Sequence, residues 1–203
     1  MPALVKLFVS SSNPGKLREY QVLAAGHAVE LELLPGLDHL PRFEENAPTF
    51  AENAAGKALH YSRYAERPVI ADDSGLVVPA LGGAPGVKSA RYAGAGASDA
   101  DRVRKLLEEM RGKSGNERRA RFVCVLALAQ CGRARAVFSD AVEGELLLAP
   151  RGNQGFGYDP IFFYAPLGKT FAQLSLEEKN LHSHRGKAFR KLLAFFESPT
   201  GVV

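Results

Sequence analysis

The sequence of 203 residues is poor in cysteine and contains no long apolar run. Its two cysteines, Cys124 and Cys131, cannot form a disulfide framework, and no four-ligand Cys/His spacing of a zinc site is present. The longest apolar run, Val123 to Ala129, is far below the roughly 20 residues that span a bilayer. Residues 1–9 are too few for a signal peptide and lack its cleavage site. We therefore expect a soluble cytoplasmic protein without a membrane partner.

Neither sign of charge is in large excess, since 26 Lys and Arg face 22 Asp and Glu and give a net charge of +4. The densest basic stretch, residues 102–121, contains interleaved acidic side chains and no aromatic ring. This pattern favours a solvated helix face and argues against a nucleic-acid partner. With 46% hydrophobic and 24% charged residues the composition is globular, and the length predicts a single domain over residues 1–203 without a separable linker.

Strand and helix signals alternate along the first two thirds of the chain. The apolar patterns predict strands over residues 4–9, 29–34, 69–71, 121–130 and 135–148. Helices are expected from Pro14 onward, over residues 49–66 and 99–110, and after Ser183. The two late strands flank Cys131-Gly132-Arg133 and form a plausible antiparallel hairpin. The fold class is therefore α/β, with a mixed β-sheet flanked by helices.

The first expected strand leads into a helix through a polar segment, Ser11, Ser12, Asn13, Pro14, Gly15 and Lys16. Asn13 is a preferred N-cap and Pro14 a preferred first helical residue. A helix N-terminus binds phosphate or carboxylate, and Lys16 opposes the helix dipole unless an anion lies in front of it. The spacing is not that of a Walker A loop. An ordinary capped junction explains the same residues.

Two adjacent carboxylates, Asp72 and Asp73, follow the short strand at 69–71 and precede Ser74-Gly75. At the carboxyl end of a strand in an α/β sheet, such groups suit Mg²⁺ binding or general-base chemistry. Adjacent strand residues face opposite sides of a sheet, so only one of the pair should enter a given site. An Asx turn is the alternative explanation of this pattern.

A later segment combines glycines with a ring, in residues 155–160, Gly-Phe-Gly-Tyr-Asp-Pro. The glycines let the backbone approach something flat, and Phe156 offers a stacking face. Asp159 precedes a proline, which favours extended geometry there. A turn with core aromatic residues is the alternative.

Ser183 is a good N-cap that places His184 and Arg185 in the first turn of the last helix. Cations there oppose the helix dipole, as Lys16 does, and two such helix starts are expected when both face one polyanion. Glu44 and Glu45 lie in a loop and become relevant if Asp73 holds a magnesium ion that needs a second carboxylate.

In this order and spacing, these segments resemble the inosine triphosphate pyrophosphatase family. The matching motifs are Ser12-Asn13-Pro14-Gly15-Lys16, Phe50-Ala51-Glu52-Asn53-Ala54 with Lys57, Ala71-Asp72-Asp73-Ser74-Gly75-Leu76, Gly82-Gly83-Ala84-Pro85-Gly86, Ser89-Ala90-Arg91-Tyr92, Gly155-Phe156-Gly157-Tyr158-Asp159-Pro160 and Ser183-His184-Arg185. The resemblance covers nearly the whole chain. The family usually has Thr-Gly where this chain has Ser11-Ser12; the hydroxyl is retained, but a Cβ stands where glycine is usual.

The resemblance implies hydrolysis of the non-canonical purine triphosphates ITP, dITP and XTP to the monophosphate and pyrophosphate, with Mg²⁺ or, as a substitute, Mn²⁺. It implies an elongated mixed sheet with two lobes around a central cleft, and a homodimer. Asp73 would be general base and metal ligand, with Glu44 or Glu45 as the second metal carboxylate. Phosphates or sugar would contact Ser11, Ser12, Asn13, Pro14, Gly15, Lys16, Lys57 and Ser74. The base would contact Phe156, Gly157, Tyr158 and Asp159, and Lys179, His184 and Arg185 would complete the pocket.

Selection of a 6-keto purine requires hydrogen-bond donors aimed at O6. The candidates are backbone N–H groups near Tyr158 and Asp159, and the side chains of His184 or Arg185. Two alternative functions stay open, a pyrophosphatase for modified pyrimidine nucleotides and a nucleotide- or RNA-binding module without catalysis. A Nudix hydrolase is not expected, because no Arg-Glu-x2-Glu-Glu helix is present.

Overall fold

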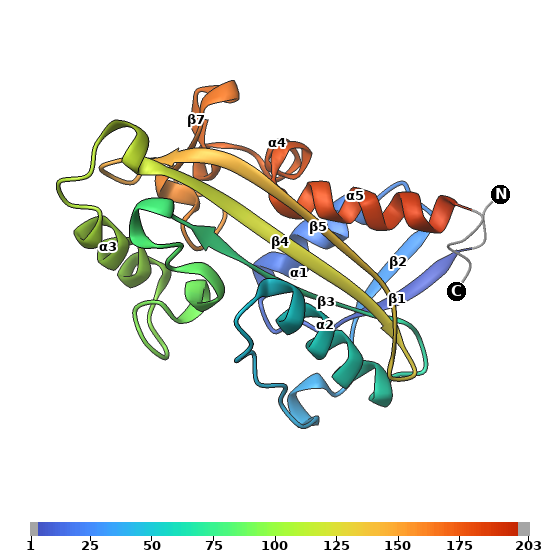
Figure 1. Ribbon diagram of the computed structural model, residues 1–203. Helices are drawn as coiled ribbons and strands as arrows, with labels where there is room; N and C mark the ends of the chain where they lie inside the picture. The colour runs from blue at the N-terminus through green and yellow to red at the C-terminus, as the bar shows by residue number, and fades with distance from the viewer. Residues whose placement is uncertain (1–3, 199–203) are drawn as a thin grey trace. The chain divides into compact units, whose positions relative to one another are not determined.

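A computed structural model describes residues 4–198 (Figure 1). The described chain forms two compact units. Unit 1 comprises residues 4–73, 124–140 and 185–198, and unit 2 comprises residues 74–123 and 141–184. Each unit has its own hydrophobic core, so each is described by itself.

The strands form a seven-stranded sheet of order β2-β1-β3-β4-β5-β6-β7. Their bounds are Val5–Val9 (β1), Val29–Leu33 (β2), Val69–Val77 (β3), Arg119–Gln130 (β4), Arg133–Leu146 (β5), Phe162–Tyr164 (β6) and Lys169–Thr170 (β7). Strand β1 pairs in parallel with β2 and β3, whereas β6 pairs antiparallel with β5 and β7. The predicted α/β fold with a mixed sheet is therefore confirmed.

The α-helices are Pro14–Ala24 (α1), Phe50–Tyr61 (α2), Asp99–Glu109 (α3), Leu176–His182 (α4) and His184–Glu197 (α5). Asn13 caps α1 as predicted, and its side chain accepts hydrogen bonds from the N–H groups of Gly15 and Lys16. Helix α2 is shorter than predicted, because a 3₁₀ turn follows from Ser62. Helix α4 was not predicted; α5 begins directly after Ser183, as expected.

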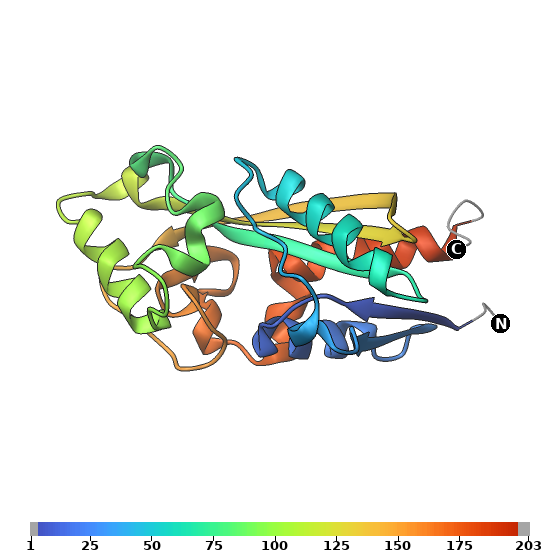
Figure 2. The ribbon, with the colours of Figure 1, turned by 90° about the horizontal axis from the view of Figure 1, so that it is seen from below.

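In unit 1, helices cover both faces of the sheet. One cluster joins α1 and α5, through Tyr20 and Phe189, to strand residues that include Ile70. The opposite cluster joins α2, through Ala54 and Ala58, to strand residues that include Ala71. Figures 1 and 2 show α5 and α2 on opposite sides of the strands. Neighbouring residues of β3 therefore face different helices, as the period of a strand requires.

The hairpin expected around residue 131 is present in unit 1, with slightly different ends. Strands β4 and β5 are neighbours in the sheet, and only Cys131 and Gly132 separate them. Both residues have positive φ, of 49° and 72°. This is the pattern of a type I′ turn, which suits the twist of a two-residue hairpin.

In the core of unit 2, α3 packs against residues of β3, β4, β5 and β6. Val103, Leu106 and Met110 are buried there, and Phe162 and Phe171 lie in the same cluster. The basic stretch is paired with acids on the surface, in Arg102–Asp99, Arg104–Asp101, Lys105–Glu109 and Lys113–Glu117. A solvated helix face thus accounts for these residues. No helix within residues 4–198 is long and apolar enough to cross a membrane.

Arg118 departs from that solvated pattern, because it is 8% exposed. Its guanidinium donates to the carbonyl oxygens of Leu146 at 2.6 Å and Leu147 at 2.7 Å, and at longer range to those of Met110 and Lys113. Burial lowers the pKa of this side chain. Arg118 therefore joins the end of β5 to the segment after α3 inside unit 2.

Candidate active site

The acidic pair lies inside a strand rather than after one. Strand β3 continues through Asp72, Asp73, Ser74 and Gly75 to Val77. The strand end expected at residue 71, and the Asx turn considered as an alternative, are therefore wrong. Aspartate is unfavourable in strands, but propensity is weak where tertiary partners are available, and both carboxylates have such partners.

The alternation along β3 sends the two carboxylates to opposite faces of unit 1. Asp72 lies two residues from Ile70, on the face covered by α1 and α5, and its Oδ2 is 2.8 Å from Lys16 Nζ. Asp73 lies two residues from Ala71, on the face covered by α2, and its Oδ2 accepts a hydrogen bond from Asn53 Nδ2 at 2.9 Å. The expectation that the pair splits between two environments is confirmed.

A buried cluster of charges surrounds Asp72. Arg185, in the first turn of α5, has Nε 3.8 Å from Asp72 Oδ2 and also pairs with Glu19 of α1. The side chains of Arg185 and Glu19 are each 2% exposed. The structure thus brings the cations of two helix starts, Lys16 and Arg185, to one anion, and this anion is a carboxylate of the chain itself.

These partners determine the charge state of Asp72. Burial alone would raise its pKa, but Lys16, Arg185 and Lys57 outweigh burial and lower the pKa to about 2. The pKa of Arg185 is shifted upward, which also favours the charged form. Burial acts to lower this pKa, but Glu19 and Asp72 raise it well above the ordinary value. Asp72 is therefore ionised at neutral pH and serves as a fixed counter-ion.

Asp73 has the opposite shift. Burial raises its pKa to about 6, against the hydrogen bond from Asn53 and the charge of Lys16, while Glu45 adds to the rise. A carboxylate with a pKa close to neutral can accept a proton from water and release it again in one reaction cycle. Of the two carboxylates, Asp73 is the one suited to general-base chemistry.

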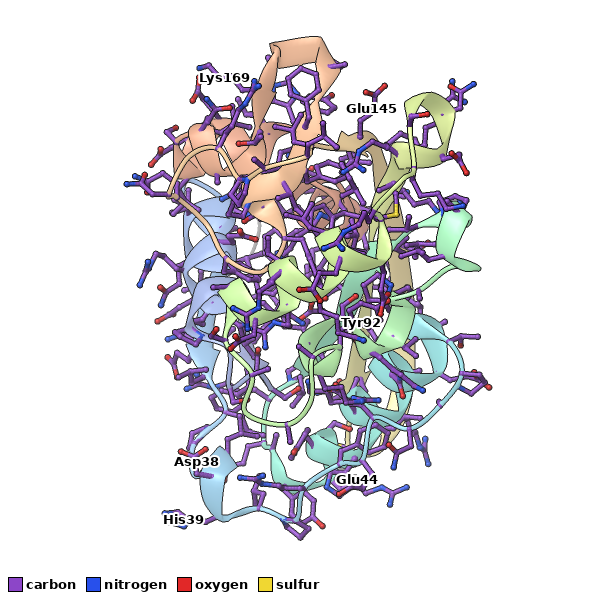
Figure 3. The ribbon with its side chains drawn as sticks, turned by 90° about the vertical axis from the view of Figure 1, so that its left-hand side faces the viewer. Asp38, His39, Glu44, Tyr92, Glu145 and Lys169 are labelled. Atoms are coloured by element: carbon purple, nitrogen blue, oxygen red, sulfur yellow. The ribbon has the colours of Figure 1, made fainter. Side chains whose placement is uncertain are left out.

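Of the two predicted metal glutamates, the structure places Glu45 in the cluster around Asp73. Lys57 Nζ, from α2, is 2.5 Å from Glu45 Oε1. Burial acts to lower the pKa of Lys57, but Glu45 and then Asp72 and Asp73 raise it. Glu44 is exposed (Figure 3), and its Oε2 is 3.5 Å from the amide nitrogen of Asn46.

Asn53 links this loop to the strand, which the sequence did not reveal. Its Oδ1 accepts from Ala47 N at 3.0 Å, and its Nδ2 donates both to Ala47 O and to Asp73. Asn53 is fully buried, on the same helix face as Ala54. The sequence does contain one indication of this role: Asn53 is an amide next to the apolar residues of its helix, and an amide that is buried there needs hydrogen-bond partners.

The N-terminus of α1 is closed by its own cap. Asn13 Oδ1 accepts from Gly15 N at 2.9 Å and from Lys16 N at 3.3 Å, and Ser11 Oγ accepts from Asn13 N at 3.2 Å. The side chain of Asn13 therefore occupies two of the N–H groups expected for an anion. Among residues 4–198, Cys131 is the only non-glycine residue with positive φ, so Ser12 carries no left-handed strain.

In unit 2, the aromatic segment is folded around Asp159. Asp159 Oδ2 accepts from Phe156 N at 2.9 Å and pairs with Lys179 Nζ, which lies 4.7 Å from the centroid of the Phe156 ring. Asp159 begins a 3₁₀ turn, so the extended geometry expected before proline is wrong; the turn hydrogen bonds override that bias. Tyr158 is buried, and its hydroxyl donates to Ser89 O at 2.9 Å.

The remaining predicted residues of unit 2 are mostly buried. His184 is 3% exposed and stacks on Phe122, with ring centroids 4.8 Å apart and an interplanar angle of 9°. The side chain of Lys179 is 3% exposed, and Ser74 is half-buried within β3. Residues 155–160, called the aromatic loop below, are therefore held in unit 2 by the buried ion pair of Asp159 and Lys179.

The side-chain oxygens of unit 1 suit a hard divalent cation that is bound partly by the protein and partly by the substrate. Among residues 4–198 there is no group of three His, Cys, Asp or Glu that could hold a metal ion alone. Asp73 and Glu45 are oxygen ligands, and magnesium is usually bound through one or two carboxylates together with substrate phosphates and water. The residues present fit that mode.

A mixed sheet flanked by helices, with a carboxylate of raised pKa on β3 and two lysines paired with acids, defines an α/β protein with a charged cluster in unit 1. The chain belongs to the Ham1 family, whose model matches residues 7–195. A dITP/XTP pyrophosphatase of Geobacillus kaustophilus is 49% identical over 196 residues, which cover 97% of this chain and 96% of that relative. The family resemblance drawn from the motifs is thereby confirmed.

Solved structures show the same fold. A HAM1 protein from Coxiella burnetii has a TM-score of 0.85 at 39% identity, covering 95% of this chain and 98% of that one. The Ham1 protein of Staphylococcus aureus has a TM-score of 0.83 at 40% identity, with 95% and 98% covered.

Proposed function

We propose that this chain hydrolyses dITP, XTP and ITP between the α and β phosphates, releasing the nucleoside monophosphate and pyrophosphate. Asp73 carries the proposal, because its pKa of about 6 and its contact with Asn53 give a positioned base within unit 1. The 49% identity to a dITP/XTP pyrophosphatase supports the same substrate class. Removal of deaminated purines from the nucleotide pool follows from that chemistry.

The phosphates would bind to unit 1. A triphosphate with one bound Mg²⁺ keeps about two negative charges, and Lys16 and Lys57 are the lysines proposed to contact them. Lys57 would become available to the phosphates when Glu45, its partner here, turns to the metal. Asp73 and Glu45 would hold Mg²⁺, or Mn²⁺ in its place. When bound, the metal supplies charge stabilisation to the phosphoanhydride oxygens.

Asp73 would orient a water molecule and accept its proton as the water attacks. The amide of Asn53 holds Oδ2 of this carboxylate, which leaves Oδ1 as the oxygen for the water. Asp72 and Arg185 would not contact the substrate, because both are buried and paired with each other. Their role would be to hold Lys16 in position through its ion pair with Asp72. Arg185 is thus proposed as a positioning residue rather than a direct donor to substrate.

The base would bind to unit 2 against the ring of Phe156. In the described loop, the N–H groups of Phe156, Gly157 and Asp159 donate to Asp159 Oδ2, Asp99 Oδ2 and Phe156 O. Within the described residues, this leaves the N–H groups of Gly155 and Tyr158 without an acceptor in the chain, and we assign Tyr158 N–H, which follows the fixed Gly157, to a keto oxygen. A 6-amino group would meet this donor with a donor of its own, at a cost of about 1–3 kcal/mol.

The test is a substrate panel with the purified chain. We expect dITP, ITP and XTP, with Mg²⁺, to yield pyrophosphate, and a chelator to stop the reaction. Release of orthophosphate, or equal turnover of ATP and ITP, would overturn the proposal. Preference for a modified pyrimidine triphosphate would establish the alternative enzyme class, and binding without turnover would establish a binding module.

Three further properties are proposed on the family resemblance. We propose that residues 1–203 work as one catalytic domain, that the protein is a homodimer, and that it acts in the cytoplasm. Light scattering coupled to size exclusion tests the dimer, and fractionation of cells tests the location.

A further inference from the structure

One hydrogen bond connects the aromatic loop to the first residue of α3. Asp99 Oδ2 accepts from the backbone N–H of Gly157 at 2.7 Å, across 58 positions of the sequence. Both residues belong to unit 2. The sequence motifs do not predict this contact, because an acidic residue in the first turn of a helix is common and is explained by the helix dipole alone.

Arg102 braces this carboxylate from the next turn of α3. Its Nη2 pairs with Asp99 Oδ1, while its Nη1 donates to Ala97 O at 2.6 Å and to Ala90 O at 2.9 Å. The side chain of Arg102 is 18% exposed. Both oxygens of Asp99 are therefore engaged, and the carboxylate is fixed against the segment before α3.

The neighbouring residue of the loop is fixed to the same segment. The hydroxyl of Tyr158 donates to Ser89 O, next to the carbonyl of Ala90 that Arg102 binds. Ser89 is itself held, since its hydroxyl donates to Gly86 O at 2.6 Å and accepts from Leu76 N at 2.9 Å. Two adjacent carbonyls thus anchor Gly157 and Tyr158, one directly and one through Asp99 and Arg102.

Gly157 has no side chain that could hold the loop by packing. Its φ is +63°, and a Cβ placed on it would meet nothing within 4 Å. The peptide that precedes Gly157 carries the carbonyl of Phe156, and the peptide that follows carries the N–H of Tyr158. The Phe156–Gly157 peptide is held at both of its polar groups, since Phe156 O accepts from Asp159 N–H at 3.3 Å and Gly157 N–H donates to Asp99 Oδ2 at 2.7 Å. The bond to Asp99 is the shorter of the two, and it ties this peptide to α3.

We propose that Asp99 is a positioning residue for purine recognition, which orients the Gly157 peptide and through it the ring of Phe156 and the N–H of Tyr158. This inference rests on the proposed function, since it assigns the loop to the base. Asp99 has no contact with the reacting atoms in this account. Its loss should therefore weaken binding of the base and its selection, and leave the chemical step almost intact.

The test compares Asp99→Ala with Asp99→Asn and with Asp101→Ala. Asp101 is the matched control, because it is also an aspartate in the first turn of α3 and also pairs with an arginine three residues on. In Asp99→Ala we expect hydrogen exchange at Gly157 N–H to rise about tenfold, which equals about 1.4 kcal/mol. KM for dITP should rise by a similar factor, with kcat within about twofold.

Asp99→Asn keeps an oxygen that accepts from Gly157 N–H, so it should restore most of the exchange protection and most of the KM. Asp101→Ala also removes the capping hydrogen bonds from Ser98, so it measures the effect of a weakened helix start, and it should change either quantity by less than about threefold. Equal effects of Asp99→Ala and Asp101→Ala would overturn the proposal, as would an Asp99→Ala protein with wild-type KM and an unchanged ratio of dITP to dATP turnover. A wild-type protein that hydrolyses no triphosphate would instead overturn the proposed function, while the exchange measurement still tests the hydrogen bond.

Discussion

Lys16 Nζ lies 2.8 Å from Asp72 Oδ2, with the two side chains 15% and 1% exposed. A lysine in the first turn of a helix opposes the helix dipole, at a cost of about 0.3–1 kcal/mol. The buried ion pair offsets this cost, and Arg185 adds a second cation on the same carboxylate. The adjacent carboxylate, Asp73, faces the other side of the strand, and its pKa is shifted the opposite way. Two neighbouring residues of β3 thus have opposite pKa shifts: Asp72 is a buried counter-ion, and Asp73 is the residue that we propose as the general base.

Replacing Asp72 should destabilise the fold. The pKa of Asp72 in the folded state, about 2, is below its unfolded value of 3.8. Its contribution to stability is therefore complete above about pH 4 and is lost as the pH falls toward 2. We expect Asp72→Asn to lower the free energy of unfolding by about 3 kcal/mol at pH 7, because Lys16 and Arg185 lose their shared anion.

Urea unfolding at pH 7 and at pH 3 measures this effect. The control is Asp38→Asn, because Asp38 is exposed on a 3₁₀ turn (Figure 3). The free energy of unfolding of the Asp38→Asn protein should stay within about 0.5 kcal/mol of the wild-type value. An Asp72→Asn protein as stable as this control would refute the structural role.

Replacing Asp73 should have the opposite effect on stability. Its folded pKa, about 6, is above the unfolded value of 3.8, so the folded state binds the proton more tightly. Ionised Asp73 therefore destabilises the fold, and this penalty grows between about pH 4 and pH 6 and is complete above pH 6. We expect Asp73→Asn to raise the free energy of unfolding at pH 8 by about 1–3 kcal/mol, with almost no gain at pH 4.

The same substitution should remove the activity. In the wild type, kcat/KM should fall as the pH drops through about 6, because protonated Asp73 cannot accept a proton from water. Asp73→Asn should reduce kcat by more than about 100-fold, and the residual rate should lack this acid limb. A loss below about tenfold, or roughly 1.4 kcal/mol, would exclude Asp73 as the base.

Structural features that depend on residues close together in the sequence are predictable from it, whereas features that depend on distant partners are not. Asn13 and Pro14 mark the start of α1 through contacts within one turn, so the cap was predicted correctly. The length of β3 was missed because the partners that admit Asp72 and Asp73 to a strand come from distant helices. Glu19 was missed for the same reason, since its partner Arg185 is 166 positions away.

The sequence does not distinguish Glu44 from Glu45, because both stand in a loop and only the fold places Glu45 beside Lys57. If Glu45 is the second metal carboxylate, as we propose, Glu45→Gln should raise the Mg²⁺ concentration for half-maximal activity about tenfold. The matched control, Glu44→Gln, should change this concentration by less than about twofold. A metal titration of dITP hydrolysis distinguishes them, and equal effects, or a larger effect at Glu44, would reassign the second ligand.

Two glycines of the aromatic loop offer a sharp test of the role of Asp159. Gly155 and Gly157 both have positive φ, +73° and +63°, so alanine at either position costs about 1 kcal/mol of backbone strain. A Cβ on Gly155 would lie 2.1 Å from Asp159 Oδ2, whereas a Cβ on Gly157 would meet nothing within 4 Å. The difference between the two variants therefore isolates displacement of the Asp159 carboxylate.

Displacement of Asp159 would break its bond from Phe156 N and leave Lys179 buried without its closest anion. We expect Gly155→Ala to lower the free energy of unfolding by about 2–4 kcal/mol and to raise KM for dITP at least tenfold. Gly157→Ala should cost only the shared strain, about 1 kcal/mol of unfolding free energy, and it serves as the control for stability alone, since its own residue lies in the loop assigned to the base. Thermal unfolding and steady-state kinetics, run side by side, decide the matter. Equal losses in the two variants would mean that backbone strain alone governs this loop, and that Asp159 does not hold the ring in place for the base.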